Sequence, residues 1–262
     1  MSRVYNHKKD VLDGTELKFG VAHHNNKLAS NSVPPKFDLR KISDCVPPIL
    51  DQGQLGACGP NEISNALRYC IGREIGTKLE WQPSRLYIYY FTRLLEGSPL
   101  NQDTGISIKG GMKAIAKYSA CCEVNWPYDI HKFMKSPPLS AIKASHVHLN
   151  GFKYLNVPQE LSHLKNALVA GFPIVLGIQV YDSFESKEVA CTGIVPMPNT
   201  NTEVFKGGHC VSLWAYNDEN STFTCSNSWS AKWGNQGYFT LPYSYLLDPT
   251  LASDLWAISY FK

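Results

Sequence analysis

The stretch DQGQLGACGPNEISNALRYC, residues 51–70, contains a cysteine at a position where a thiol can react. Gly53 and Gly56 allow a sharp turn just before Cys58, and Pro60 just after it is typical of the first turn of a helix. A thiol at a helix N-terminus lies at the positive end of the helix dipole, which lowers its pKa and favours the nucleophilic thiolate. A buried cysteine that only packs at the helix start would show the same pattern, so this stretch alone leaves both interpretations open.

A thiolate nucleophile needs a base, and His209 is the histidine best placed to act as one. The sequence KGGHCVSLWAY puts His209 after two glycines, near the start of a predicted strand. The turn NDEN follows this strand, and a turn centred on residues 218–219 puts His209 opposite residues 227 and 228. Asn227 can accept the imidazole N–H and fix the ring, and Trp229 can shield that hydrogen bond from water. A lone strand histidine is more often structural, but the asparagine opposite makes His209 a candidate base.

The elements that position these residues change character along the chain. Apolar residues at helical spacing predict helices over residues 60–70, 84–97, 109–120 and 157–170. Strands are predicted within residues 172–184, 209–229, 236–246 and 255–261. A mainly helical first half followed by antiparallel strands indicates an α+β protein, with two lobes that meet at a cleft. We expect residues 1–35 to form an N-terminal extension and a candidate short propeptide, residues 36–150 a mainly helical lobe, and residues 151–262 a mainly β lobe.

Composition excludes several classes of function. The 262 residues are 44% hydrophobic and 18% charged, which indicates a globular protein. The net charge of +3 comes without a Lys/Arg-rich run, so we expect no nucleic-acid partner. The longest apolar stretch, residues 168–178, is interrupted by Gly and Pro and is too short to span a bilayer, so we expect no membrane association.

The cysteines do not follow a metal or redox pattern. There are eight of them, with no CxxC and no HxxxH, so we expect no metal and no cofactor. Residues 1–20 lack the apolar region of a signal peptide, which favours an intracellular or packaged compartment over secretion. In such a compartment disulfides are not expected, and cysteines other than Cys58 are predicted to be small buried apolar side chains.

Three blocks in order, DQGQLGAC, GGHCVSLWAY and NSWSAKWGNQGYF, resemble the papain-like cysteine peptidases, the family of the cathepsins. The similarity spans about Val33 to Lys262, with PPKFDLR resembling the mature N-terminus of the family and GISIKGGMKAIAKYSACCEVNWPYD its mid-domain stretch. The resemblance implies the papain-like two-lobe fold, with a helical lobe and an antiparallel β-barrel-like lobe on either side of the active-site cleft. It also implies a thiol protease of the cathepsin-like type, a hydrolase that cleaves peptide bonds and is a candidate zymogen.

The resemblance assigns roles to particular residues. Cys58 matches the nucleophile, His209 the general base and acid, and Asn227 the residue that orients the imidazole. Gln52 matches the side-chain donor of the oxyanion hole, which it shares with the Cys58 backbone N–H. The implied mechanism is acyl transfer through a Cys58 thiolate–His209 imidazolium pair and a thioester. The substrate-binding residues that it implies are Gly56, Ser107, Ile108, Gly208 and Trp229.

Four departures from the family pattern carry information. Leu55 stands where the family usually has a disulfide-forming cysteine, which fits a reducing compartment. Gly59 replaces the usual tryptophan after the nucleophile, and Gly208 replaces an acidic residue often found before the histidine. The extension of about 35 residues is short for the family and lacks a heptad pattern, so it either blocks the cleft in another way or is not inhibitory. The pair His23–His24 lies before the nucleophile and is interpreted as part of a solvated loop.

Three other functions compete with the endopeptidase. An exopeptidase on the same scaffold would follow if the extension fills one end of the cleft. A catalytically silent homologue would bind peptides or a partner without cleaving them. A thiol-based metal-binding or redox protein conflicts with the cysteine spacings. The expected partners are polypeptide substrates, with protein inhibitors as further candidates, and the chain is expected to be a monomer.

Overall fold

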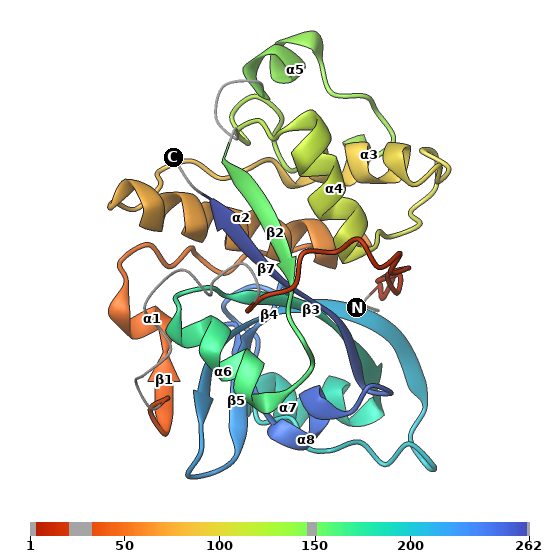
Figure 1. Cartoon of the computed structure of the whole chain (residues 1–262). Coiled ribbons are helices and arrows are strands. Elements are labelled where there is room, and N and C mark those ends of the chain that lie inside the picture. Colours follow the sequence, from red (N-terminus) through yellow and green to blue (C-terminus); the bar gives the residue numbers. More distant parts are fainter. Residues whose placement is uncertain (1–3, 21–32, 146–150, 261–262) are drawn as a thin grey trace.

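A computed structural model describes residues 4–20, 33–145 and 151–260 of the chain (Figure 1). The strands pair through an antiparallel sheet, most of which lies in the lower half of Figure 1, while β2 and the end of β7 extend upward beside α2 and α4. The helices are α1 (Leu39–Ile42), α2 (Cys58–Ile75), α3 (Arg85–Leu95), α4 (Ile108–Tyr118), α5 (Leu139–Ser145), α6 (Leu161–Val169), α7 (Lys187–Thr192) and α8 (Tyr243–Leu247). The strands are β1 (Lys36–Asp38), β2 (Phe152–Asn156), β3 (Ile174–Tyr181), β4 (Phe205–Asn217), β5 (Thr222–Ser226), β6 (Tyr238–Pro242) and β7 (Ala252–Tyr260).

Helix α2 is the central element, because it packs against both the sheet and the other helices. It contacts β4 and β7 on one side and α3 and α4 on the other. Ile63 and Leu67 on this helix are fully buried, and burying a side chain of this size stabilises a fold by roughly 1.5–3 kcal/mol. The helix ends at Gly76, which has a φ of 73° and returns its N–H to the carbonyls of Arg73 and Gly72. The residue that begins this rigid helix is therefore held in a fixed place.

Serine side chains begin the two helices that pack on α2. The Ser84 hydroxyl accepts a hydrogen bond from the Tyr87 N–H at the start of α3. The Ser107 hydroxyl accepts one from the Gly110 N–H at the start of α4. Such caps satisfy backbone donors that the first helical turn leaves unpaired. The predicted helices at 60–70, 84–97 and 109–120 are confirmed as α2, α3 and α4, whereas the fourth begins only at Leu161.

The sheet follows the order β2-β7-β3-β4-β5-β6, and β1 pairs with the distal part of β4. Its pairings are antiparallel, which confirms the α+β class. Within the described ranges no ladder joins β2 to β6, so the sheet is open and the expected barrel-like closure is not found. Strand β4 occupies the middle of the order and carries both His209 and the buried aromatic core residue Trp214.

The β4–β5 hairpin differs slightly from the predicted register. Ser212 pairs with Ser226, but Ala215 pairs with Thr224, because the register shifts between Leu213 and Ala215. Pairing in β5 ends at Ser226, so Asn227 lies just beyond the ladder. His209 and Asn227 were predicted to face each other across the hairpin. They do so through a side-chain hydrogen bond, although their backbone positions are not paired.

Two other elements depart from the sequence expectations. The strand predicted over residues 236–246 ends at Pro242, and the chain then turns into α8. Proline has no N–H to donate to a neighbouring strand, which explains why the strand stops there. Strand β2 and the short helices α5 and α7 were not predicted, because segments of this length carry little periodicity.

The described N-terminal segment, residues 4–20, crosses the front of the molecule between α4 and the sheet (Figure 1, dark red). It is largely without helix or strand, but its backbone bonds to the body at several points. Phe19 donates its N–H to the Asn156 carbonyl over 2.8 Å, and the ring of Phe19 packs on Phe172. The segment is therefore docked on the folded body.

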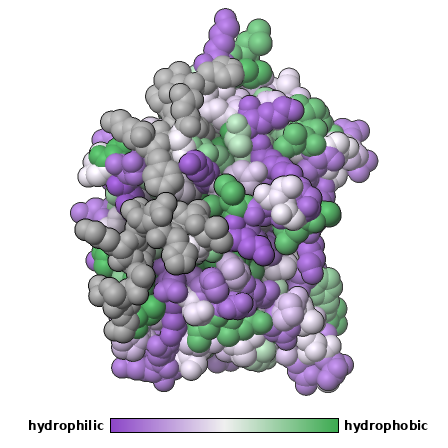
Figure 2. All heavy atoms as spheres, viewed as in Figure 1, coloured by the Kyte–Doolittle hydropathy of each residue, from purple (hydrophilic) through white to green (hydrophobic). Residues whose placement is uncertain are grey.

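The surface on this face of the molecule is a mosaic of polar and apolar groups (Figure 2). Outside the grey atoms, the green apolar residues lie in small groups separated by purple polar ones. Scattered apolar residues of this kind are normal on a protein surface and do not mark an interface. In the part of the chain that is described, no helix has the length and apolar character needed to cross a bilayer.

Candidate active site

Cys58 is the first residue of α2 and follows directly on the glycine-containing turn. Its sulfur lies close enough to the backbone N–H of Cys210, the residue after His209, for that N–H to favour the thiolate. The fold thus brings the thiol to the strand that carries the histidine, although 151 residues separate them along the chain. Cys58 is only 2% exposed, and this burial raises the pKa of the thiol to about 11, although the N–H groups of Cys210 and Gly59 act to lower it. In this arrangement the sulfur is protonated at neutral pH.

His209 faces Asn227 and Trp229. The imidazole Nε2 lies 2.8 Å from the Asn227 side-chain oxygen, and both residues are buried. The backbone N–H of Ser228 donates to the same oxygen over 2.9 Å, which fixes how the amide points. The Trp229 indole lies 5.0 Å from the imidazole, centroid to centroid, with the planes tilted by 32°. The indole therefore covers the histidine–asparagine pair, as the sequence predicted.

Gln52 is fully buried at the turn before Cys58. Its amide nitrogen donates to the Leu55 carbonyl over 2.9 Å, and its amide oxygen accepts from the Ser228 hydroxyl over 2.8 Å. The Gln52 backbone N–H also donates to the Ser228 carbonyl over 2.9 Å. These bonds fix the side-chain orientation of Gln52 and tie the turn to the segment that carries Asn227.

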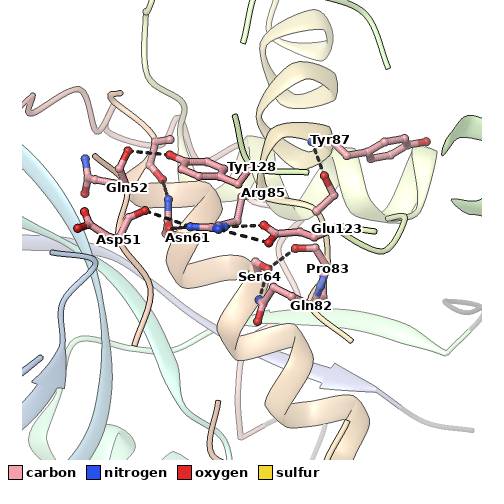
Figure 3. Close-up of polar contacts among 12 residues, drawn as sticks. Asp51, Gln52, Asn61, Ser64, Gln82, Pro83, Arg85, Tyr87, Glu123 and Tyr128 are labelled. Carbon is pink, nitrogen blue, oxygen red and sulfur yellow. Dashed lines mark hydrogen bonds and ion pairs between the residues drawn. The ribbon is translucent and has the colours of Figure 1, made fainter. Parts of the chain in front are cut away.

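A buried arginine supports this turn from the side of the helices (Figure 3). Arg85 donates to the Asp51 carbonyl over 3.2 Å and to the Asn61 side-chain oxygen over 2.9 Å. It forms an ion pair with Glu123 at 2.6 Å and lies 3.7 Å above the Tyr128 ring. Its planar group can make all of these contacts at once, so one side chain joins the turn to the start of α2.

The N-terminal segment passes directly over these residues. The Tyr5 ring meets the His209 imidazole edge-on at a centroid distance of 5.7 Å and the Trp229 indole at 5.9 Å. The next residue, Asn6, lies against Gly56, where an added Cβ would come within 2.6 Å of the Asn6 amide nitrogen. The Asn6 amide also donates to the Asp103 carbonyl over 2.9 Å.

The following residues of the segment continue along the groove. The His7 N–H donates to the Gly208 carbonyl over 3.0 Å, directly beside the histidine. The Lys8 N–H donates to the Ile106 carbonyl over 3.1 Å, and Lys8 forms a parallel bridge with Ser107. Backbone hydrogen bonds to both walls show that the groove accepts an extended polypeptide.

Lys109 on α4 anchors the far part of the segment. Its ammonium group donates to the Val11 carbonyl and to the Asp13 carboxylate, each over 3.1 Å, and to the Glu16 carboxylate. Its backbone N–H donates to the Asp10 carboxylate over 2.9 Å. The hydrogen bonds from Thr15 and Lys109 hold the pKa of Asp13 well below its usual value, so this attachment is charged at neutral pH.

Comparison with known proteins identifies the family. Residues 104–245 match the family described as "Papain family cysteine protease", a match that covers more than half of the chain. The chain belongs to the papain family. It is a cysteine peptidase, and the α+β fold with its thiol, imidazole and amide is the one that the sequence motifs led us to expect.

Individual proteins resemble this papain-family chain to different degrees. A protein of Acanthamoeba polyphaga mimivirus, described as an uncharacterized peptidase C1-like protein, is 40% identical over 246 residues, covering 88% of this chain and 78% of its own. Cathepsin K of Gallus gallus is 27% identical over 225 residues, 81% of this chain and 60% of its own. The crystal structure of xylellain, a cysteine protease from Xylella fastidiosa, superposes with a TM-score of 0.84 at 30% identity, covering 98% of this chain and 96% of that one.

The substrate-binding residues predicted for this papain-family chain fall into two groups. Gly56, Gly208, Trp229 and Ser107 all contact the N-terminal segment in the groove. Ile108 does not line the groove, because it lies in the first turn of α4 with its side chain fully buried. The strand-like stretch expected at residues 107–109 ends at the helix cap Ser107, and its groove-facing backbone is that of Ile106 and Ser107.

A buried carboxylate one helical turn after Cys58 was not predicted from the sequence. Glu62 lies one helical turn after Cys58 and is 1% exposed. It accepts a hydrogen bond from the Ser226 hydroxyl over 2.8 Å. Burial raises the pKa of Glu62 to about 7, although this hydrogen bond acts to lower it. Glu62 follows Cys58 by four residues, so both lie on the same apolar face of the helix. This spacing is the sequence signal that could have predicted its burial.

The departures noted in the sequence have local explanations. Leu55 is 3% exposed, so an apolar side chain fills the space at this position of the turn. Gly59 leaves room for Ile106, since an added Cβ would come within 3.0 Å of that side chain. All eight cysteines lie in described segments and carry free thiols. His23 and His24 lie outside the described residues, and among those described no group of three His, Cys, Asp or Glu could hold a metal ion.

Proposed function

We propose that this papain-family peptidase is an endopeptidase that acts through a Cys58 thiolate and a His209 imidazolium. The observation that carries the proposal is an extended polypeptide in the groove, formed by the chain's own residues 5–8 next to the imidazole and to the turn that leads to Cys58. A groove that bonds to a peptide backbone on both walls suits a peptide substrate.

The chemistry follows from the positions of the polar groups. The Cys58 sulfur attacks the scissile carbonyl, and the resulting oxyanion accepts hydrogen bonds from the Gln52 amide and the Cys58 N–H. His209 then gives its proton to the leaving amine, and a thioester to Cys58 remains. His209 next takes a proton from water, the hydroxide attacks the thioester, and the carboxylic acid leaves as the Cys58 thiolate and the His209 imidazolium are regained. Because Nε2 faces the Asn227 oxygen, Nδ1 is the nitrogen that exchanges the proton.

The N-terminal segment acts as a cover in this proposal. With the segment in place, burial keeps the thiol of Cys58 protonated, since its pKa is raised to about 11. Displacement of the segment lets water reach the sulfur, which removes much of the desolvation and leaves the favourable helix N-terminus and the Cys210 N–H. The chain is thereby made in an inactive form and becomes active when residues 5–8 leave the groove.

The path of the segment favours an endopeptidase over an exopeptidase. The chain continues beyond Tyr5 at one side of Cys58 and beyond Lys8 at the other, so internal peptide groups fit on both sides. An exopeptidase would instead need a wall or a charged group that captures a chain end. Cleavage of a peptide blocked at both ends decides between them, since only an endopeptidase can hydrolyse it at an internal bond.

Covalent labelling tests the proposal and separates it from a silent peptide-binding homologue. We expect an epoxide-type thiol reagent to modify Cys58 once incubation at acidic pH has displaced the N-terminal segment, with no labelling there in Cys58→Ala. Cys191→Ala is the matched control, because this exposed thiol lies away from the groove and its loss leaves the labelling and hydrolysis unchanged. Labelling without any hydrolysis of a blocked peptide would identify the silent homologue.

Self-processing gives a second measurement of the same site. We expect mass spectrometry after incubation at acidic pH to show a cut between Ser30 and Phe37 that does not occur in Cys58→Ala. The cut would release the segment that covers the groove. A chain that hydrolyses blocked peptides while keeping its N-terminus would show that the segment is displaced without being removed.

A further inference from the structure

We propose that a pocket beside the catalytic histidine selects peptide substrates with a cationic side chain, which Asp254 binds. The pocket is the one that His7 of the N-terminal segment fills, and its walls come from β3, β4 and β7. The inference rests on the proposed function, because it names the substrate class of the same groove.

The first observation is a hydrogen bond between an imidazole and a carboxylate at the bottom of the pocket. The His7 Nε2 lies 3.0 Å from the Asp254 carboxylate oxygen, and the two side chains are 1% and 5% exposed. A hydrogen bond between an imidazole and a carboxylate that is so well covered is a specific contact, because a buried carboxylate without a partner is costly. The segment therefore shows which chemistry the pocket accepts.

The second observation is that the pocket is built from glycines. An added Cβ at Gly177 on β3 would come within 2.3 Å of the His7 Nε2. Gly177 pairs with Cys210 on β4, and an added Cβ at Gly208 on the same strand would come within 2.9 Å of the His7 carbonyl oxygen. A side chain at Gly177 would fill the pocket that leads to Asp254, and one at Gly208 would collide with the peptide backbone beside it.

The third observation concerns the conformation of Asp254. Its φ of 60° lies in the left-handed region, which is uncommon for residues other than glycine. The Ser253 hydroxyl donates to the same carboxylate oxygen over 3.0 Å, so the group is held in place without His7. Next to it the β3–β7 pairing shifts register between Val175 and Gly177. The left-handed conformation of Asp254 on β7 and the register shift on β3 together orient the carboxylate toward the groove.

The charged groups near the pocket belong partly to the N-terminal segment and partly to the folded body, so departure of the segment changes the charge around Asp254. Asp10 is the other carboxylate that acts on Asp254, and it belongs to the segment. Departure of the segment removes both His7 and Asp10 and uncovers Asp254 with its Ser253 bond. A lysine or arginine of a substrate then replaces the imidazole, and the arginine head can pair with both carboxylate oxygens.

The experiment compares peptides that differ at one residue. The chain is first incubated at acidic pH to displace the N-terminal segment. It is then given blocked peptides in which a single arginine is placed in turn at each position, and a matched series carries leucine instead. At one position near the scissile bond we expect arginine to exceed leucine in kcat/KM by about tenfold or more. The same peptides are also tested for how well they protect Cys58 from alkylation. This measures the preference as binding as well as turnover.

Variants then assign the preference to the pocket. Asp254→Asn should lower kcat/KM for the arginine peptide by about tenfold while the leucine peptide changes by less than about threefold, which also shows that the variant is folded. Glu219→Gln on the exposed β4–β5 turn is the matched control and should change neither. Equal preference for the two series, or an arginine preference that survives in Asp254→Asn, would overturn the inference.

Failure of the pocket and failure of the proposed function give different results. Leucine peptides cleaved faster than arginine peptides would refute the cationic pocket and leave the peptidase intact. Arginine peptides that protect Cys58 from alkylation but are not hydrolysed would keep the pocket and refute the proposed catalysis.

Discussion

The buried carboxylate of Glu62 should make the stability of the protein depend on pH in a way that one substitution removes. Glu62→Gln keeps the size and one acceptor oxygen for the Ser226 hydroxyl, but it cannot ionise. In the native protein burial raises the pKa of Glu62 from 4.5 to about 7, so the folded state holds the proton more tightly than the unfolded state. Its contribution to stability is present in full below pH 4.5 and is lost as the pH rises through about 7.

The size of the effect follows from this shift. When the folded state has the higher pKa, each unit of pKa difference lowers the unfolding free energy by about 1.4 kcal/mol once the pH lies above both pKa values. Between pH 5 and pH 8 the wild-type chain should lose roughly 2–3 kcal/mol of unfolding free energy through Glu62, and Glu62→Gln should lose none through this position. Other titrating groups are common to both chains and cancel in the comparison.

Urea unfolding at pH 5 and pH 8 measures this difference directly. Both chains carry Cys58→Ala, so that the unfolded protein is not digested during the experiment. Glu219→Gln is the control for loss of an exposed carboxylate and should show the wild-type dependence on pH. A difference between wild type and Glu62→Gln that changes by less than about 0.5 kcal/mol between the two pH values would mean that Glu62 is not ionising inside the fold.

Three further predictions concern activity. Gln52→Ala should lower kcat by roughly a hundredfold with little change in KM, because its amide bonds to the oxyanion that forms only during reaction; steady-state kinetics with a blocked peptide would show otherwise if KM changed instead. Asn227→Ala should lower kcat by at least about tenfold and alter the pH profile of Cys58 alkylation, since the imidazole loses the acceptor that orients it; an unchanged profile would contradict this role. Lys109→Gln should release the N-terminal segment and speed alkylation of Cys58 at neutral pH, whereas an unchanged rate would mean that the other contacts suffice to hold the segment.

Much of the architecture could be predicted from local sequence signals. Helix α2 shows apolar residues at helical spacing, a proline at its start and a glycine at its end, and each of these acts through the local backbone. The position of Asn227 opposite His209 could be predicted because a hairpin joins them over a short distance in sequence. The predicted β4–β5 register was wrong, because the pairing shifts between Leu213 and Ala215. Such a shift depends on packing, which a local sequence pattern does not indicate.

Long-range contacts explain what could not be predicted. Glu62 and Asp254 are carboxylates, a residue type expected on the surface, and only the tertiary fold buries the first and covers the second with His7. The N-terminal residues look like a polar extension, because nothing in their own sequence says which groove they occupy. Ile108 was assigned to the groove by its place near the third helix, but helix geometry turns its side chain into the core.

Ser228 has a consequence for how this protein could change over evolution. Its hydroxyl bonds to the Gln52 amide, its carbonyl to the Gln52 N–H, and its own N–H to the Asn227 oxygen. Gln52, proposed to stabilise the developing negative charge, and Asn227, proposed to orient the imidazole, are thus joined through one small residue. Neither can drift without moving the other, so adaptation to new peptides is confined to the outer walls of the groove while the reacting centre is inherited as a block.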